Sequence, residues 1–297
     1  MHRPALAAAL LLAPLLPGCA SSGPAPDVVA TFYPLAYLAG RIGGGDLAVA
    51  SIVREGVEPH DYDPTTTDLA RISDARLLVV QGAGFESWIV AARSQAPNTR
   101  LVTATDGISL RENPDAAEAE ELPSDPHTWV DPVLYARMAR TVESAMAEAF
   151  LEHAAGFHVR ADTLAADLRQ LDAEYRAGLA NCATRYAITG HAAFGYLAAE
   201  YNFTQIPIQG LDPEAEPDTA TINHVIEEAK KHGITIIFFE ELVSPRMAEA
   251  IAKEVHAETR VLSPIEAIPA DEAAQGRDYF AVQRENLANL RDAMRCA

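Results

Sequence analysis

The feature that most constrains this chain is a regular alternation of short β-branched runs with amphipathic segments of helical length, which starts at Asp27. Such alternation is typical of βα units and favours parallel sheets covered by helices. We therefore predict an α/β protein whose sheets are mainly parallel. In the first half of the chain the predicted strands cover residues 28–32, 47–53, 77–81 and 101–105.

A long stretch without a predicted strand divides the chain into two halves. Asp131 and Pro132 place an N-cap acid before a proline at the first helical position, and the helical pattern continues to Phe150. A second helix is predicted over residues 156–179, where large apolar side chains share one stripe. The alternation then resumes, with predicted strands at residues 185–189, 205–209, 235–239 and 260–262. We expect an N-terminal lobe over residues 28–150, a connecting helix within 151–181 and a C-terminal lobe over 182–297.

The N-terminus predicts export from the cytoplasm. Residues 1–18 join a weakly basic start to an apolar run that is too short to cross a bilayer as a mature helix. The run ends in a segment that resembles a bacterial lipobox, in which Cys19 would be lipidated after cleavage; secretion without a lipid is the alternative. Residues 19–27 have the composition of a flexible tether. We expect a body held outside the cytoplasmic membrane by a lipid anchor.

The charge of the chain argues against nucleic acid as a partner. The formal net charge is −19, and the only lysines are Lys230, Lys231 and Lys253, so the field of the whole protein repels a polyanion. Residues 111–124 are rich in acids and have little to bury, which predicts a mobile surface loop that leads into His127.

Two cysteines remain after Cys19, and their separation in sequence excludes a CxxC motif. In an oxidising compartment, Cys182 and Cys296 could form a disulfide that ties the C-terminal helix to the start of the second half. Two buried free thiols are the alternative.

Three histidines stand in short polar loops that follow predicted strands: His60, His127 and His191. Ligands of open α/β sheets bind outside the carboxyl ends of the strands, so these three imidazoles can converge on one ion. Several neutral imidazoles with a carboxylate or water suit tetrahedral Zn²⁺, whereas Mn²⁺ prefers more oxygen ligands. The pattern predicts a zinc site.

A fourth ligand is expected from an acid near the end of a second-half strand. Glu266 is our choice, with Glu58 and Glu240 as alternatives. Ligating imidazoles usually donate their other ring N–H to a nearby acceptor, and we assign Asp61 and Asp131 to that role, with a helix cap as the alternative for Asp131. The sequence contains no HExxH, GxSxG or Walker A motif, so no catalytic residue is assigned.

With these residues in place, the mature chain resembles the solute-binding proteins of bacterial zinc and manganese ABC importers, the family that includes the ZnuA and TroA proteins. The segments that carry the resemblance are Pro59-His60-Asp61-Tyr62, Gly82-Ala83-Gly84-Phe85-Glu86-Ser87-Trp88, residues 125–132, Gly190-His191-Ala192-Ala193-Phe194-Gly195-Tyr196, residues 210–217 and residues 238–245. The resemblance implies two α/β lobes joined by a long rigid helix, with the ion in the cleft between them.

The resemblance also implies which lobe supplies each ligand. His60 and His127 would come from the first lobe and His191 from the second. Manganese-selective members typically have a glutamate at the third position, so His191 points to zinc. Many relatives have an aspartate where this chain has Ser263, while Glu266 matches a glutamate that relatives can use. The loop before His127, rich in histidine in many zinc members, holds only acids here.

The implied function is capture of Zn²⁺, with Mn²⁺ as the less favoured ion, by a monomeric lipoprotein that performs no chemistry. It would hand the ion to a cognate ABC permease and its ATPase. A zinc-dependent hydrolase is one alternative, because three histidines with an open position also describe a catalytic site. A surface adhesin with a structural zinc is the other.

Overall fold

The computed structural model of the protein describes residues 25–113, 119 and 122–297. The predicted export signal and Cys19 lie outside the described residues, as does part of the predicted acidic loop. Among the described helices, none combines the length and the apolar character that a bilayer crossing needs.

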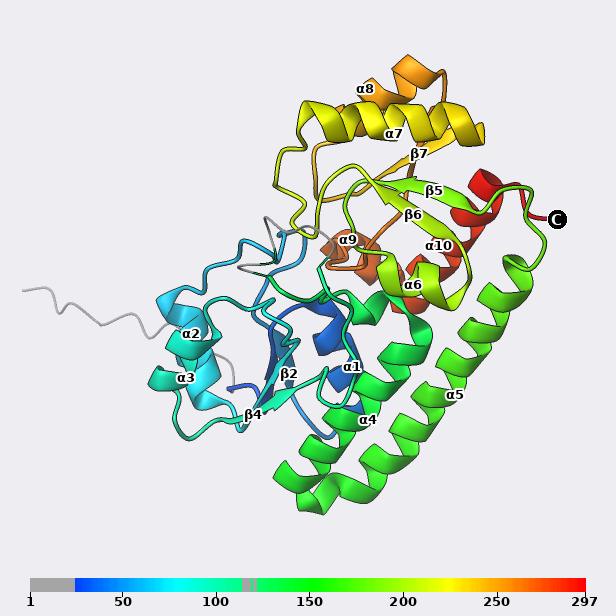
Figure 1. Ribbon diagram of the computed structural model, residues 1–297. Helices are drawn as coiled ribbons and strands as arrows, with labels where there is room; N and C mark the ends of the chain where they lie inside the picture. Colours follow the sequence, from blue (N-terminus) through cyan, green and yellow to red (C-terminus); the bar gives the residue numbers. More distant parts are fainter. Residues whose placement is uncertain (1–24, 114–118, 120–121) are drawn as a thin grey trace, which may run out of the picture.

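The first lobe is built on a four-stranded parallel sheet with the strand order β2-β1-β3-β4. Every residue of the aliphatic strands β1 and β3 is buried, as expected for a sheet covered on both faces. Helices α2 and α3 cover one face, and α1 and α4 (Pro132–Ala149) cover the other (Figure 1). The elements of this lobe are β1 (Val28–Ala30), α1 (Tyr33–Gly43), β2 (Val49–Ser51), α2 (Thr66–Asp74), β3 (Leu77–Val80), α3 (Ile89–Gln95) and β4 (Arg100–Thr103).

The second lobe repeats this topology, with a parallel sheet in the order β6-β5-β7-β8. Helices α7 and α8 pack on one face, whereas α10 packs on the other against β5 and β8. The elements are β5 (Tyr186–Thr189), α6 (Gly195–Glu200), β6 (Thr204–Pro207), α7 (Thr219–His232), β7 (Ile236–Phe239), α8 (Arg246–Val255), β8 (Glu258–Val261), α9 (Ala270–Ala274) and α10 (Tyr279–Met294).

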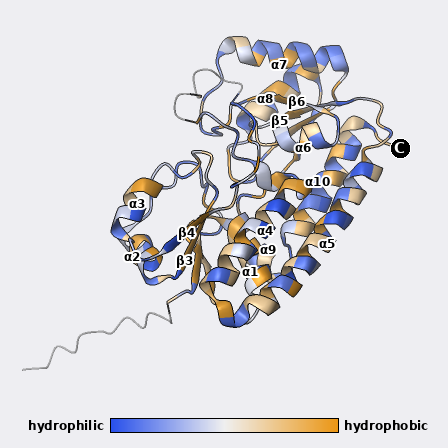
Figure 2. Ribbon diagram, turned by 60° about the horizontal axis from the view of Figure 1, so that its bottom comes forward, coloured by the Kyte–Doolittle hydropathy of each residue, from blue (hydrophilic) through white to orange (hydrophobic). Residues whose placement is uncertain are grey.

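Two antiparallel helices separate the sheets in sequence. Helix α4 (Pro132–Ala149) follows the short 3₁₀ turn η2 (Thr128–Val130), and α5 (Ala154–Gly178) follows η3 (Leu151–His153). Both α5 and α7 carry hydrophilic and hydrophobic residues on different sides (Figure 2), which is the pattern of helices with one solvent-facing side.

The predicted fold class is confirmed. Within the described residues, each of the predicted strands coincides with an observed strand to within two residues at either end, and the two long helices lie where the pattern placed them. Such end shifts are the ordinary precision of a boundary read from a pattern.

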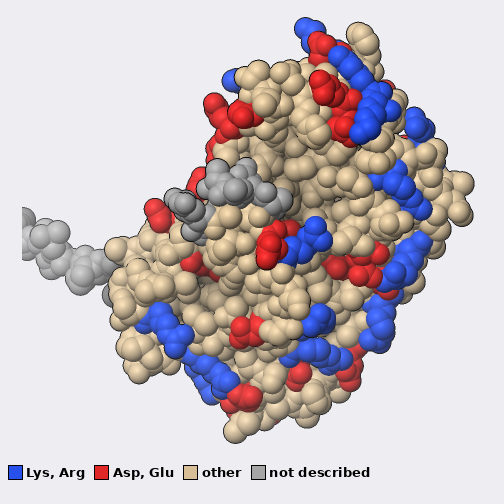
Figure 3. Space-filling model, in the orientation of Figure 1, with Lys and Arg blue, Asp and Glu red and all other residues tan. Residues whose placement is uncertain are grey.

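The lobes are also joined through α10, whose first residues pack against the first lobe. Tyr279 stacks on Tyr135 of α4 with ring centroids 4.3 Å apart, and the neighbouring Asp278 accepts a hydrogen bond from Tyr37 Oη at 2.7 Å. The other end of α10 leads to Cys296, which forms a disulfide with Cys182 at an S–S distance of 2.01 Å. The disulfide reading of the two cysteines is therefore confirmed. On the face drawn in Figure 3, acidic and basic side chains are interspersed.

Candidate metal centre

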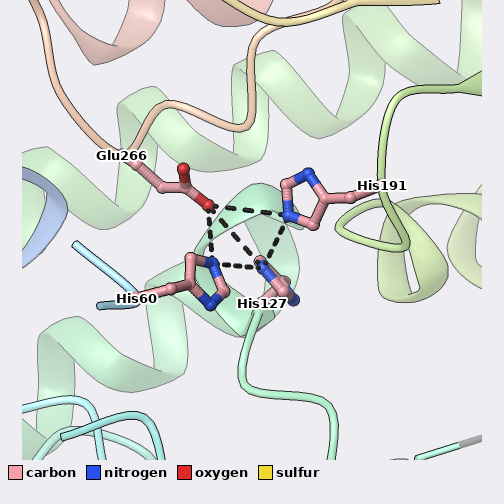
Figure 4. Close-up of side chains that lie close together, drawn as sticks. All are labelled: His60, His127, His191 and Glu266. Atoms are coloured by element: carbon pink, nitrogen blue, oxygen red, sulfur yellow. Dashed lines mark hydrogen bonds and ion pairs between the residues drawn. The ribbon is translucent and has the colours of Figure 1, made fainter. Parts of the chain in front are cut away.

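The carboxyl ends of the two sheets face each other, and four predicted site residues meet between them (Figure 4). His60 lies in the loop after β2, and His127 lies between β4 and η2. His191 follows β5 by two residues, and Glu266 lies in the loop after β8. Each lobe thus contributes two of the four side chains, as the resemblance implied for the histidines.

One nitrogen or oxygen atom from each residue points to a common centre. His127 Nε2 lies 3.3 Å from His60 Nε2 and 3.1 Å from His191 Nε2. Glu266 Oε1 lies 3.2 Å from His60 Nε2, 3.7 Å from His127 Nε2 and 3.8 Å from His191 Nε2. All four atoms lie within 4.8 Å of one another, and the side chains are almost completely buried.

These spacings fit a small tetrahedral ion. Ligand atoms held at roughly 2.0–2.1 Å from a zinc ion in a tetrahedron are separated by roughly 3.3 Å. The observed distances scatter around that value, and the donor set of three imidazoles and one carboxylate is one that zinc prefers. An octahedral oxygen-rich shell for Mn²⁺ would need donors that this cluster does not contain.

Two carboxylates fix the orientation of the deepest imidazoles. Asp125 Oδ1 lies 2.9 Å from His127 Nδ1 and also accepts the backbone N–H of His127 at 2.9 Å. Glu240 Oε2 lies 2.7 Å from His191 Nδ1, and its Oε1 accepts the backbone N–H of His191 at 2.9 Å. A carboxylate at Nδ1 places the proton of a neutral imidazole there, so that Nε2 presents its lone pair to the centre.

These contacts correct the predicted orienting residues. Asp61 is exposed, and its backbone N–H donates to Glu58 rather than its side chain reaching a histidine. Asp131 accepts the backbone N–H of Val133 at 2.8 Å and caps α4, which is the alternative the sequence left open. Asp125 stands two residues before His127, a spacing from which a carboxylate reaches both the backbone and the ring of the same histidine.

The two alternative fourth ligands have other partners. Glu240 is held by His191, as described above. Glu58 accepts the backbone N–H of His60 at 3.0 Å and lies 4.0 Å from His60 Nε2. Burial raises the pKa of Glu58 to about 7.

The electrostatics of the cluster favour positive charge at its centre. Burial opposes charge on His127, but its hydrogen bonds to Asp125 and Glu266 outweigh this and raise its pKa to about 9. Burial likewise opposes charge on Glu266, and its hydrogen bonds to His127 and His60 outweigh that and lower its pKa. A carboxylate is thus kept ionised among the imidazoles, which is the arrangement a divalent cation requires.

Hydrogen bonds join the first lobe to the second lobe beside His127. Tyr196 of α6 accepts the backbone N–H of Arg111 at 2.9 Å and donates to the carbonyl oxygen of Asp125 at 2.8 Å. Glu112 and Ser124 pair as an antiparallel bridge, so the described ends of the predicted acidic loop lie together. The segment that carries Asp125 and His127 is therefore held by the second lobe.

Comparison with known proteins gives one consistent result. The model of the family described as zinc-uptake complex component A periplasmic, ZnuA, matches residues 28–293. The zinc-binding protein AdcA of Streptococcus pyogenes is 33% identical over 283 residues, covering 89% of this chain and 55% of that protein. The high-affinity zinc uptake system protein ZnuA of Bacillus subtilis is 31% identical over 284 residues, covering 92% of this chain and 89% of that protein. The chain thus spans about half the length of the AdcA relatives that it matches.

Solved structures agree with the sequence relatives. A crystal structure of ZnuA superposes with a TM-score of 0.80 at 28% identity, covering 91% of this chain and 99% of that one. The Zn(II)-bound ZnuA-like domain of Streptococcus pneumoniae AdcA gives a TM-score of 0.77 at 29% identity, covering 90% and 98%. The laminin-binding adhesin Lmb of Streptococcus agalactiae gives 0.82 at 28% identity, covering 91% and 99%. From its two lobes, its interlobe cluster and this match over nearly its whole described length, the chain belongs to the ZnuA family of zinc-uptake components.

Proposed function

We propose that the protein captures Zn²⁺ outside the cytoplasm and delivers it to an ABC permease for uptake. The observation that carries the proposal is the convergence of His60, His127 and His191 Nε2 atoms at 3.1–3.3 Å spacing beside a buried carboxylate. Nε2 lone pairs that face one another at this distance repel unless a cation or a proton lies between them. In this proposal the three imidazoles and Glu266 are the ligands, and Asp125 and Glu240 orient two of the rings.

The names of the relatives support zinc as the cargo. The curated relatives are named for zinc binding and zinc uptake, and none of the names reported above is that of an enzyme. A zinc-dependent hydrolase is the alternative function, and turnover of ester or phosphoester substrates by the purified zinc-loaded protein would favour it over transport.

The test of the function has two parts. Elemental analysis of protein purified from its native compartment should find about one zinc per chain, and the His191→Ala variant should lose it. Cells that lack the gene should take up radioactive zinc slowly at low external zinc, and the wild-type gene should restore uptake while the His191→Ala gene should not. Normal uptake by the His191→Ala cells would contradict the proposal.

Anchoring and domain limits are proposals from the sequence. We propose that the export signal ends before Cys19, that a lipid on Cys19 holds the protein at the membrane, and that residues 19–27 form the tether. A Cys19→Ser variant should then leave the membrane fraction. The lobes would extend over residues 28–150 and 182–297, with the connecting helix in residues 151–181.

A surface adhesin is the other alternative function. It would require that the protein binds a host ligand independently of the permease.

A further inference from the structure

The loop that presents Glu266 contains a strained residue. Ile265 has φ = +62°, in the left-handed region that branched side chains avoid. The other non-glycine residues with positive φ among the described residues are Ala83, Asn202, His256 and Arg295, none of which is β-branched. Ile265 is also completely buried, so its conformation is imposed by its surroundings rather than by a free loop. The strain lies one residue before the proposed carboxylate ligand.

Side chains from two other elements hold the turn made by residues 263–266. Asn286 of α10 accepts the backbone N–H of Ser263 at 2.9 Å and donates to its carbonyl oxygen at 2.7 Å. The hydroxyl of Ser263 accepts the backbone N–H of Ile265 at 3.2 Å. The indole N–H of Trp129 donates to the carbonyl oxygen of Pro264 at 2.7 Å. The peptide groups that lead into the strained residue are therefore fixed.

Trp129 ties this turn to the opposite lobe. It stands two residues after His127, is completely buried, and its ring centroid lies 5.0 Å from that of His127. Its own carbonyl oxygen accepts a hydrogen bond from Tyr279 Oη at 2.7 Å. The short segment that presents one ligand from the first lobe therefore also clamps the turn that presents a ligand from the second lobe.

We propose that residues 263–266 form a strained arm that the Trp129 indole holds in the conformation that aims Glu266 at the metal. Trp129 is then a positioning residue that sets how long the ion stays bound. Loss of the clamp lets Ile265 relax to negative φ, and Glu266 swings out of the cluster. The ion is left on three imidazoles without the charged ligand. This inference rests on the proposed zinc site and gives the ion a way out that needs no separation of the lobes.

The experiment measures zinc dissociation by stopped-flow mixing of the zinc-loaded protein with excess chelator. Trp129→Phe removes the indole N–H and keeps an aromatic ring beside His127. We expect its dissociation rate to rise roughly tenfold or more, the size of effect seen for residues that orient ligands. Tyr135→Phe is the matched control, because it removes another buried hydrogen bond to a backbone carbonyl, that of Pro34 at 2.6 Å. Its rate should stay within about twofold of wild type.

Two further variants separate positioning from general loosening. In a Glu266→Ala background, Trp129→Phe should have no further effect on dissociation, because the clamp acts only through Glu266. Adding Ile265→Gly to Trp129→Phe should slow dissociation again, since glycine adopts positive φ without strain. If Trp129→Phe acted through a general structural defect, adding Ile265→Gly would instead speed dissociation further. The faster dissociation would then also be seen in the Glu266→Ala background.

The outcomes are distinct from those that test the function. If the wild-type protein holds no zinc, the proposed function fails and this inference fails with it. If the wild-type protein holds zinc but Trp129→Phe releases it at the wild-type rate, the site stands and the strained arm is wrong. The proposal of a strained arm is also wrong if Trp129→Phe speeds zinc dissociation equally in the wild-type and Glu266→Ala backgrounds.

Discussion

The site has two walls that are built differently. His127 and His191 have completely buried side chains, and each has a carboxylate at its second ring nitrogen. The side chain of His60 is 6% exposed, and its neighbour Glu58 is held by backbone N–H groups of the same loop. We call His127 and His191 with their carboxylates the inner wall, and His60 with Glu58 the outer wall. The inner wall is held by buried contacts within the protein, whereas the outer wall depends on one surface loop. A preorganised wall supplies affinity because its side chains need no rearrangement to bind the ion.

The largest expected effect comes from removing imidazoles on the two walls. His127→Ala and His191→Ala should each lower zinc affinity roughly 10³-fold, about 4 kcal/mol, because each also leaves a buried carboxylate without its ring donor. His60→Ala should lose only roughly 10–100-fold, since Glu58 or water can reach the vacant position. Competition with a chromogenic chelator measures all three, and equal losses would erase the distinction between the walls.

The second effect is the pH dependence of zinc binding. Because the pKa of His127 is raised to about 9, the metal-free protein holds a proton on that ring at neutral pH, and zinc must displace it. Affinity should therefore rise with pH up to about 9 and fall by up to about tenfold for each unit below it. Calorimetry in buffers of different ionisation enthalpy should detect about one proton released at pH 7. A flat affinity between pH 6 and 8 would contradict the assignment.

Removing the orienting carboxylates tests the inner wall directly. Asp125→Asn and Glu240→Gln should weaken zinc binding roughly 10–100-fold, because the amides orient the rings without the negative charge that makes them better donors to metal. Asp125→Asn should also reduce proton release, since Asp125 is the leading cause that raises the pKa of His127. Asp61→Asn is the matched control and should bind as wild type does.

The smallest effect is on stability and concerns Asp131, outside both walls. Burial raises the pKa of Asp131 to about 7, above its value in the unfolded chain. The folded protein therefore holds this proton more tightly, and the contribution to stability falls as pH rises from about 4 to about 7. Asparagine also caps helices, so Asp131→Asn should raise the free energy of unfolding by about 1 kcal/mol at pH 8 and by nothing at pH 4. Urea unfolding at the two pH values checks this, and an equal change at both would contradict it.

The sequence predicted the strands because their side chains follow local rules. The aliphatic strands β1 and β3 are buried throughout, and β5 and β7 are buried at three of their four residues. Such short apolar runs are typical of strands covered on both faces. It also predicted the four clustered side chains, because residues that follow parallel strands gather at one sheet edge.

The orienting contacts were not predicted because they depend on which strands are neighbours. Glu240 directly follows β7, and it reaches His191 only because β7 lies beside β5 in the sheet, an order that no local pattern states. The contact from Trp129 to Pro264 depends on how the lobes dock, which is a property of the whole fold. The role of Asp125 was predictable, because a carboxylate two residues before a histidine can reach both the backbone N–H and the ring of that histidine.

The Cys182–Cys296 bridge joins two residues that are 114 positions apart in sequence, and both second-lobe members of the metal cluster, His191 and Glu266, lie inside this covalent ring. A protease that cuts one surface loop between the two cysteines opens the ring but leaves both fragments attached to each other. Neither half of the coordination sphere can then diffuse away. A single cleavage by an extracellular protease would therefore leave the second lobe as one covalently joined unit. Without the disulfide, the same cleavage would leave two fragments with no covalent link between them.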